Sequence, residues 1–301
     1  MRRLWGAAGA LLLVVAGCAT GQPAATGGAA PPSPVPPSPT VTITHGERHG
    51  DVEQPPPFRV RYGDTELHLN PVTYCYKFTC VDGRDSGPPE VGSPERLFVF
   101  VPVFTEFTVE QVGGDDYCAG RRVAAEVTPL GEGWWSVHPR GPAGEYRVTL
   151  FARGQGGDMA AELRWTTPHD RPLPEPSARL ALIADHDGRP DSYGLELSVQ
   201  DLPTTPSQYH ATITVTASNG RSLTFEATRS PEACAGEGAI VFDEPDALAK
   251  QAAQLGDFPF TMRVELTLDG VTYVATATYP DDEIPGQEPA VALAFDPPLP
   301  R

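Results

Sequence analysis

From Phe58 onward the chain runs in short stretches that alternate apolar and polar residues. Such stretches lie at 58–62, 147–151 and 209–215, and Gly, Pro, Asn and Asp separate them. Because successive side chains of a β-strand point to opposite faces, this alternation gives each strand one apolar face that must be buried. Stretches about 8 to 12 residues apart, with turn signals between them, predict an all-β protein of the β-sandwich type.

The body of the chain also matches itself at a fixed distance. Three matches carry this signal: 107–110 with 223–226, Cys118 with Cys234, and 147–148 with 263–264. The separation is 116 residues each time. A constant offset held over about 40 residues indicates a duplication and predicts two tandem sandwiches of one kind.

The repeat and the proline-rich stretches divide the chain into six predicted segments. These are a signal peptide at 1–17, an anchor with a disordered Pro/Ala/Gly tether at 18–57, a first sandwich at 58–168, a proline-rich linker at 169–176, a second sandwich at 177–283 and a C-terminal tail at 284–301. One short helix is predicted at 244–255 in the second sandwich, because Leu248, Ala252 and Leu255 share a helical face.

A tyrosine gives the sandwich prediction a more specific form. Gly144-Glu145-Tyr146 stands just before the stretch at 147–151. This placement resembles the tyrosine corner of immunoglobulin-like sandwiches. The resemblance implies two tandem immunoglobulin-like β-sandwich domains.

The first 18 residues indicate where the protein resides. Two arginines precede an apolar run at 4–15, which is shorter than the roughly 20 residues that a membrane-spanning helix needs. The run ends in Val15-Ala16-Gly17-Cys18, which resembles the lipobox of bacterial lipoproteins. The resemblance implies that Cys18 is diacylated and becomes the mature N-terminus, so that the acyl chains hold the protein on the outer face of the cell membrane. The competing interpretation is an ordinary signal peptide with a chance cysteine.

Composition limits the partners of such a protein. The chain has 39 acidic and 22 basic residues, and loss of Arg2 and Arg3 with the signal leaves 39 against 20, a net charge near −19. A surface of this charge repels nucleic acid, so no nucleic-acid partner is expected. The abundance of Ala, Gly and Pro, with arginine in place of lysine, favours a high-GC, actinobacterial origin.

Four cysteines remain in the body: Cys75, Cys80, Cys118 and Cys234. An even number in an exported protein favours disulfides, with three possible connectivities. A straight strand would hold Cys75 and Cys80 about 16 Å apart, so a bond between them would force a tight loop. The stretch at 74–83 resembles loops of uncharacterised actinobacterial lipoproteins, and that resemblance favours Cys75–Cys80. Cys118 and Cys234 occupy matched positions and would meet about a pseudo-twofold axis, so we hypothesise a Cys118–Cys234 bond. Cys75–Cys118 is the competing pairing.

Two further sets of residues are weak candidates for ligand contact. On a strand, Trp134 and Trp135 point to opposite faces, so one ring is expected in the core and the other in solvent. An exposed ring could stack on a sugar or anchor a partner, or it could simply cover an interdomain surface. Asp185, Asp187 and Asp191 alternate around Gly188 in a faint likeness to a calcium loop, and the competing interpretation is an acidic turn.

Motifs for catalysis or metal binding are not found in the sequence. The cysteines lack zinc spacing, and the stretch at 45–49 could present two histidines to a metal only on a helix, which Gly46 and Gly50 disfavour. We therefore expect no metal, no cofactor and no enzymatic activity. The predicted role is binding or scaffolding at the cell envelope, with an envelope protein or glycan as partner and the sandwich ends or the domain seam as contact surface. The alternatives are a carbohydrate- or calcium-binding accessory module and, more remotely, a hydrolase with an unrecognised site.

Overall fold

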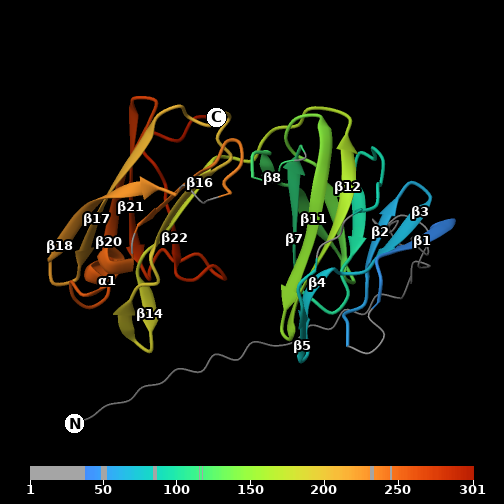
Figure 1. The fold of residues 1–301 in the computed structure, drawn as a ribbon, viewed down its shortest axis with the longest axis horizontal. Coiled ribbons are helices and arrows are strands. Elements are labelled where there is room, and N and C mark those ends of the chain that lie inside the picture. The colour runs from blue at the N-terminus through green and yellow to red at the C-terminus, as the bar shows by residue number, and fades with distance from the viewer. Residues whose placement is uncertain are drawn as a thin grey trace, which may run out of the picture. The chain divides into compact units, whose positions relative to one another are not determined.

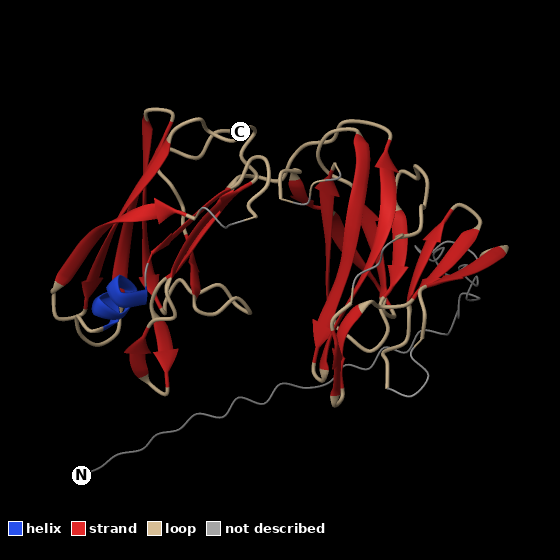
Figure 2. Ribbon diagram, in the orientation of Figure 1, coloured by secondary structure: helices blue, strands red, loops and turns tan. Residues whose placement is uncertain are grey.

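The computed structural model describes residues 38–48, 53–83, 87–114, 116, 118–230, 234–244 and 246–301 (Figure 1). The predicted signal peptide, Cys18, His49 and most of the tether lie outside these residues. The all-β prediction is confirmed, with strands throughout and one short helix, α1, at Asp246–Ala253 (Figure 2). No helix among the described residues is long and apolar enough to cross a membrane.

The first sandwich has two six-stranded sheets. One sheet has the order β1 (Val41–His45), β3 (Thr65–Leu69), β2 (Phe58–Tyr62), β6 (Leu97–Phe100), β10 (Trp134–His138) and β9 (Glu126–Gly131). The other has the order β5 (Thr79–Val81), β4 (Thr73–Tyr76), β12 (Gly157–Thr167), β11 (Gly144–Gly154), β7 (Glu106–Gly113) and β8 (Arg122–Ala124). Neighbouring strands in these sheets are antiparallel, except that β1 runs parallel to β3.

The second sandwich is one eight-stranded sheet that folds over on itself. Its order is β21 (Val271–Tyr279), β20 (Phe260–Leu268), β17 (Tyr209–Ala217), β18 (Ser222–Arg229), β19 (Ile240–Glu244), β16 (Leu195–Gln200), β13 (Ser177–Ala181) and β22 (Ala290–Ala292). The register between β18 and β19 covers two residue pairs, Thr228↔Asp243 and Arg229↔Phe242, where the chain passes between layers. A separate hairpin joins β14 (Ala184–His186) to β15 (Arg189–Asp191).

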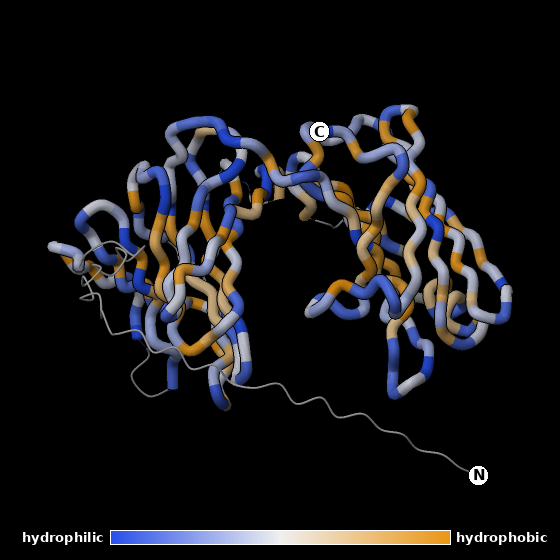
Figure 3. Tube along the Cα trace, turned by 180° about the vertical axis from the view of Figure 1, so that it is seen from behind, coloured by the Kyte–Doolittle hydropathy of each residue, from blue (hydrophilic) through white to orange (hydrophobic). Residues whose placement is uncertain are grey.

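Each sandwich has its own hydrophobic core. The first is built around Trp165 and Tyr74, and the second around Phe242 and Phe260, all of them fully buried. The alternation predicted from sequence is visible along the strands in Figure 3. In β20, buried residues occupy every second position from Phe260 to Leu268. This period of two is what a strand with one core-facing side requires.

Strand order supports the immunoglobulin-like description. In that fold, strand F lies between strands C and G in one sheet. Here β11 lies between β7 and β12, and β20 lies between β17 and β21. The Tyr146 hydroxyl, at the start of β11, donates a hydrogen bond to the Pro142 carbonyl oxygen at 2.7 Å. This bond back to the preceding loop is a tyrosine corner, as its position in the sequence predicted.

The same strand order corrects the alignment of the two copies. The constant offset equates β7 with β18, but β7 pairs with β11, whereas β17 lies between β18 and β20. The structural counterpart of β7 is therefore β17. Alternating strands of similar composition match a neighbour as well as a true counterpart, because their side-chain period is two residues.

Three predicted boundaries also differ from the structure. The segment at 41–45, placed in the tether, forms β1 at the edge of a sheet. The predicted tail at 284–301 contains β22, which pairs with β13 and places Val291 in the second core. The helix begins at Asp246 rather than at 244, because the preceding residues belong to β19.

Candidate functional site

Both tryptophans of the pair are covered. Trp135 packs against the first core, with its ring centroid 5.7 Å from that of Phe107. Trp134 is on the opposite face, yet only 8% of it is exposed, because the guanidinium carbon of Arg61 lies 4.4 Å from its ring centroid and Phe100 packs beside it. The expectation of one solvent-exposed ring was therefore wrong. Stacking on a sugar requires a free ring face, so the carbohydrate alternative loses its sequence support.

A buried carboxylate organises the charges beside Trp134. Arg61 Nε lies 2.5 Å from one Glu66 oxygen, and His68 Nε2 lies 2.7 Å from the other. Burial alone would raise the pKa of Glu66, but the hydrogen bonds from Arg61 and His68 outweigh burial and lower the pKa. The carboxylate thus remains ionised and fully engaged, which suits a structural ion pair.

The three aspartates of the calcium candidate serve a hairpin. Asp185 accepts a hydrogen bond from the Gly188 amide at 2.6 Å, and Asp191 accepts one from the Ser192 amide at 2.8 Å. Asp187 lies in the turn at φ 54°. Among the described residues there is no group of three or more His, Cys, Asp or Glu that could hold a metal ion. These aspartates therefore form an acidic turn, in which two carboxylates cap backbone amides.

The Cys75–Cys80 disulfide closes a tight hairpin (β4–β5) whose end presents an aromatic side chain. The two cysteines face each other across the hairpin and are bonded. Lys77 and Phe78 form the two-residue turn, and Lys77 has φ 56°, as the first position of a type II′ turn requires. The Lys77 amide donates to the Gly156 carbonyl oxygen at 3.3 Å, which fixes the turn against the β11–β12 loop. Phe78 is 102% exposed.

A second exposed apolar residue lies on a neighbouring loop. Val103, in the β6–β7 loop, is 54% exposed and has φ 57°, a conformation that β-branched residues rarely adopt. The amide of Phe104 donates to the Pro102 carbonyl oxygen at 2.7 Å, closing a γ-turn around Val103. The Phe104 ring packs edge-on against Tyr76 at 6.3 Å, which connects this loop to the hairpin. We call Tyr76, Lys77, Phe78 and Val103 the hairpin-tip surface.

Ion pairs flank the hairpin-tip surface. Lys77 Nζ lies 2.8 Å from a Glu53 carboxylate oxygen, and Arg153 Nε lies 2.6 Å from Glu106. An apolar centre with a polar border is the usual composition of a protein-binding patch. Sequence reasoning missed Phe78, although its place between two closely spaced cysteines is a signal that a bonded loop would expose it.

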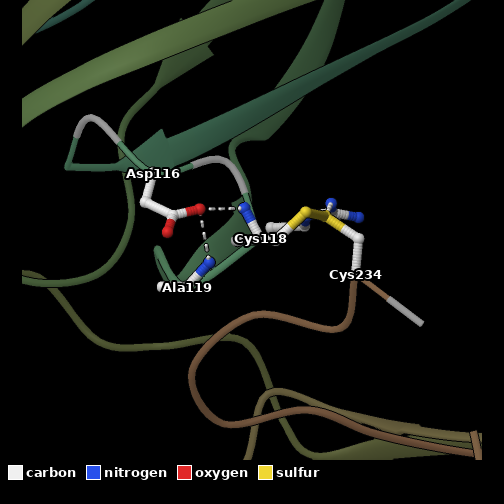
Figure 4. Close-up of a disulfide and its surroundings, with 5 residues drawn as sticks. Asp116, Cys118, Ala119 and Cys234 are labelled. Carbon is white, nitrogen blue, oxygen red and sulfur yellow. Dashed lines mark hydrogen bonds between the residues drawn. A yellow bond between two sulfur atoms is a disulfide. The ribbon is translucent and has the colours of Figure 1, made fainter. Parts of the chain in front are cut away.

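The second disulfide, Cys118–Cys234, joins the two sandwiches (Figure 4). Cys118 lies in the β7–β8 loop and Cys234 in the β18–β19 loop, so the predicted bond is present although the two loops are not structural counterparts. A carboxylate oxygen of Asp116 accepts hydrogen bonds from the amides of Cys118 at 2.9 Å and Ala119 at 3.2 Å. Arg122 Nη2 lies 3.0 Å from the sulfur of Cys234.

Arg121 reinforces this disulfide from within. Its side chain is 8% exposed, and it donates to the carbonyl oxygens of Leu202 at 2.9 Å and Pro203 at 2.8 Å, and to the Glu237 carboxylate at 2.6 Å. A buried guanidinium needs several such acceptors to offset its lost hydration. We call Cys118, Arg121, Cys234 and Glu237 the interdomain clasp.

Backbone contacts complete the interdomain clasp. The Gly236 amide donates to the Cys118 carbonyl oxygen at 3.1 Å. A Cβ at Gly236 would lie 2.5 Å from the Gly120 carbonyl oxygen, so this approach, at φ +83°, requires glycine. Near Arg121, burial raises the pKa of Asp201, and the positive charges of Arg121 and Arg140 partly oppose that rise.

Two pockets border the proline-rich linker. One of about 250 Å³ is lined by Leu173, Pro174, Glu175, Pro176, Asp201, Pro203 and Arg301. The other, of about 410 Å³, is lined by Glu126, His138, Pro139, Arg140 and 171–175. Burial and the guanidinium of Arg96 lower the pKa of His138. Neither lining contains a hydroxyl or thiol side chain.

Comparison with models of known protein families gives no match, and comparison with curated protein sequences finds no similar protein.

Proposed function

We propose that this chain is a lipid-anchored protein of the bacterial envelope that acts by binding or scaffolding, and that its hairpin-tip surface contacts an envelope protein. The observation that carries the contact surface is Phe78, an aromatic side chain 102% exposed at the end of a disulfide-bonded hairpin. The lipid anchor rests on the lipobox-like segment ending at Cys18.

Phe78 suits an anchoring residue because its surroundings hold it in position. The disulfide, the Lys77–Gly156 backbone bond and the Tyr76–Phe104 ring contact restrict the hairpin before any partner arrives. Burying a phenylalanine side chain contributes about 1.5–3 kcal/mol. A rigid hairpin loses little conformational entropy on binding, so more of that free energy appears as affinity.

The location of the surface agrees with the fold. The β6–β7 and β11–β12 loops correspond to the B–C and F–G loops of an immunoglobulin-like sandwich. Loops carried by a rigid sandwich tolerate sequence change and often carry binding residues. The fold indicates where a partner would bind, and an experiment has to identify the partner.

Site-specific photo-crosslinking in intact cells tests the proposed surface. A photoreactive phenylalanine analogue replaces Phe78 in one strain and Tyr193 in another. Tyr193 is a matched aromatic control, 70% exposed on the second sandwich. We expect one reproducible protein adduct from position 78 that is missing from position 193. Identical adduct patterns, or none from position 78, would contradict the proposal, and recovery of wall glycan alone would favour the carbohydrate-binding alternative.

A further inference from the structure

We propose that the Cys118–Cys234 bond is a thiol–disulfide exchange site, which an external dithiol reduces to remove the covalent link of the interdomain clasp. This disulfide lies apart from the hairpin-tip surface, and its exchange does not depend on the partner proposed there.

The charges around this disulfide are unequal. Arg122 Nη2 lies 3.0 Å from the sulfur of Cys234. The Asp116 carboxylate lies at the Cys118 side and accepts that residue's amide hydrogen at 2.9 Å. A guanidinium stabilises a thiolate and a carboxylate disfavours one, so Cys234 is the better leaving group of the two.

Accessibility favours the same direction of attack. Cys118 is exposed, whereas Cys234 is half-buried. An incoming thiolate therefore reaches the sulfur of Cys118 more readily. Exchange requires attack in line with the bond that breaks, and attack at Cys118 expels the sulfur that Arg122 stabilises.

Reduction of the Cys118–Cys234 bond by a dithiol takes two exchange steps. A thiolate of the dithiol attacks the Cys118 sulfur, forming a mixed disulfide there while the electron pair of the broken bond passes to Cys234 as a thiolate. The second thiol of the dithiol, once deprotonated, attacks the first sulfur of the same dithiol in the mixed disulfide. This step releases Cys118 as a thiolate. The protein gains two electrons and the dithiol becomes a cyclic disulfide.

The other disulfide lacks this arrangement. The amide of Cys75 donates to the Asp158 carboxylate at 3.3 Å, which places an anion near that bond. Cys75 and Cys80 also face each other in a hairpin and lie five residues apart, so they re-form their bond readily after opening. Reduction is expected to discriminate between the two disulfides.

Opening the bond leaves the rest of the interdomain clasp in place. Arg121 still reaches Leu202, Pro203 and Glu237, and the Gly236–Cys118 backbone bond still crosses the seam. The two thiols thus stay near each other and can re-oxidise. The reduced seam depends more on these polar contacts, so it is more sensitive to salt than the oxidised one.

Timed reduction of the full-length protein tests the proposal. The chain is treated with dithiothreitol at pH 7, quenched with iodoacetamide and analysed by peptide mass spectrometry. We expect Cys118 and Cys234 to be alkylated roughly tenfold faster than Cys75 and Cys80. With an excess monothiol, the first adduct is expected on Cys118. Equal rates for the two disulfides, or a first adduct on Cys234, would overturn the proposal.

Variants at Arg122 separate chemistry from folding. Arg122→Gln is expected to slow reduction of Cys118–Cys234 roughly tenfold and leave Cys75–Cys80 unchanged, while Arg122→Lys retains most of the rate. Arg140→Gln, at a half-buried arginine paired with Glu126, is the matched control and should not change either rate. If Arg122→Gln reduces as fast as the parent, or if both Arg122 variants accelerate reduction, the guanidinium has no role in the exchange and the assignment fails.

Discussion

At the residue scale, Glu66 shows how the outer face of the first sandwich holds a carboxylate that is 5% exposed. Arg61 and His68 bind its two oxygens, and Arg61, together with Arg59, also covers the ring of Trp134. A buried ion pair is neutral or costly overall, but removing one partner leaves the other uncompensated. The arrangement is therefore sensitive to loss of the carboxylate.

Glu66→Gln is expected to lower the free energy of unfolding at pH 7 by about 1–3 kcal/mol. The pKa of Glu66 is lowered in the folded state, so its stabilisation is present above the unfolded pKa of about 4.3 and is lost as pH falls through the folded value. The parent should therefore lose stability in acid more steeply than the variant. Urea unfolding from pH 7 to pH 3 measures both effects.

Glu265→Gln provides the control for that series. Glu265 pairs with Arg263 on an exposed face of the second sandwich, where an ion pair contributes about 0–1 kcal/mol. Equal losses from the two substitutions would show that the Glu66 network contributes no more than a surface pair.

At the element scale, β22 decides where the second sandwich ends. Its residues lie in a stretch whose prolines indicate a tail, yet Val291 pairs with Leu180 and is fully buried. We expect Val291→Ala to lower the free energy of unfolding by about 2 kcal/mol through lost packing. Val271→Ala, at a valine 49% exposed on β21, should cost less than about 0.5 kcal/mol. Thermal unfolding compares them, and similar melting temperatures would mean that β22 is dispensable.

The elements also show what local sequence encodes. Alternation predicted that the chain forms sandwiches, and Tyr146 predicted the corner at the start of β11. The same alternation places every second residue of β20 in the core. Alternation does not encode which strand lies beside which, so β7 was matched to β18 instead of β17. Trp134 is covered by Arg59 and Arg61, which come from a different strand. Arg121 finds its hydrogen-bond acceptors in the second sandwich. Such long-range contacts have no local pattern.

At the scale of the whole molecule, the proposed lipid anchor at Cys18 would place both sandwiches at the membrane surface. We expect the wild-type protein to incorporate an alkyne-tagged palmitate in cells and Cys18→Ala to incorporate none, because the lipobox-like segment predicts Cys18 as the acylated residue. Cys80→Ser is the control and should keep the label. Label retained by Cys18→Ala, or absent from the wild type, would refute the anchor.

The Cys118–Cys234 bond has a mechanical consequence for a chain held at both ends. If the proposed anchor fixes the N-terminus, tension between it and a load applied to the chain after Cys234 would pass through the disulfide and bypass the polypeptide between the two cysteines. That sequence separation is 116 residues, about 400 Å of extended chain. While the bridge is closed, β8 to β18 carry no load along the covalent path. The length by which the protein can extend under force then depends on whether the Cys118–Cys234 bond is oxidised or reduced.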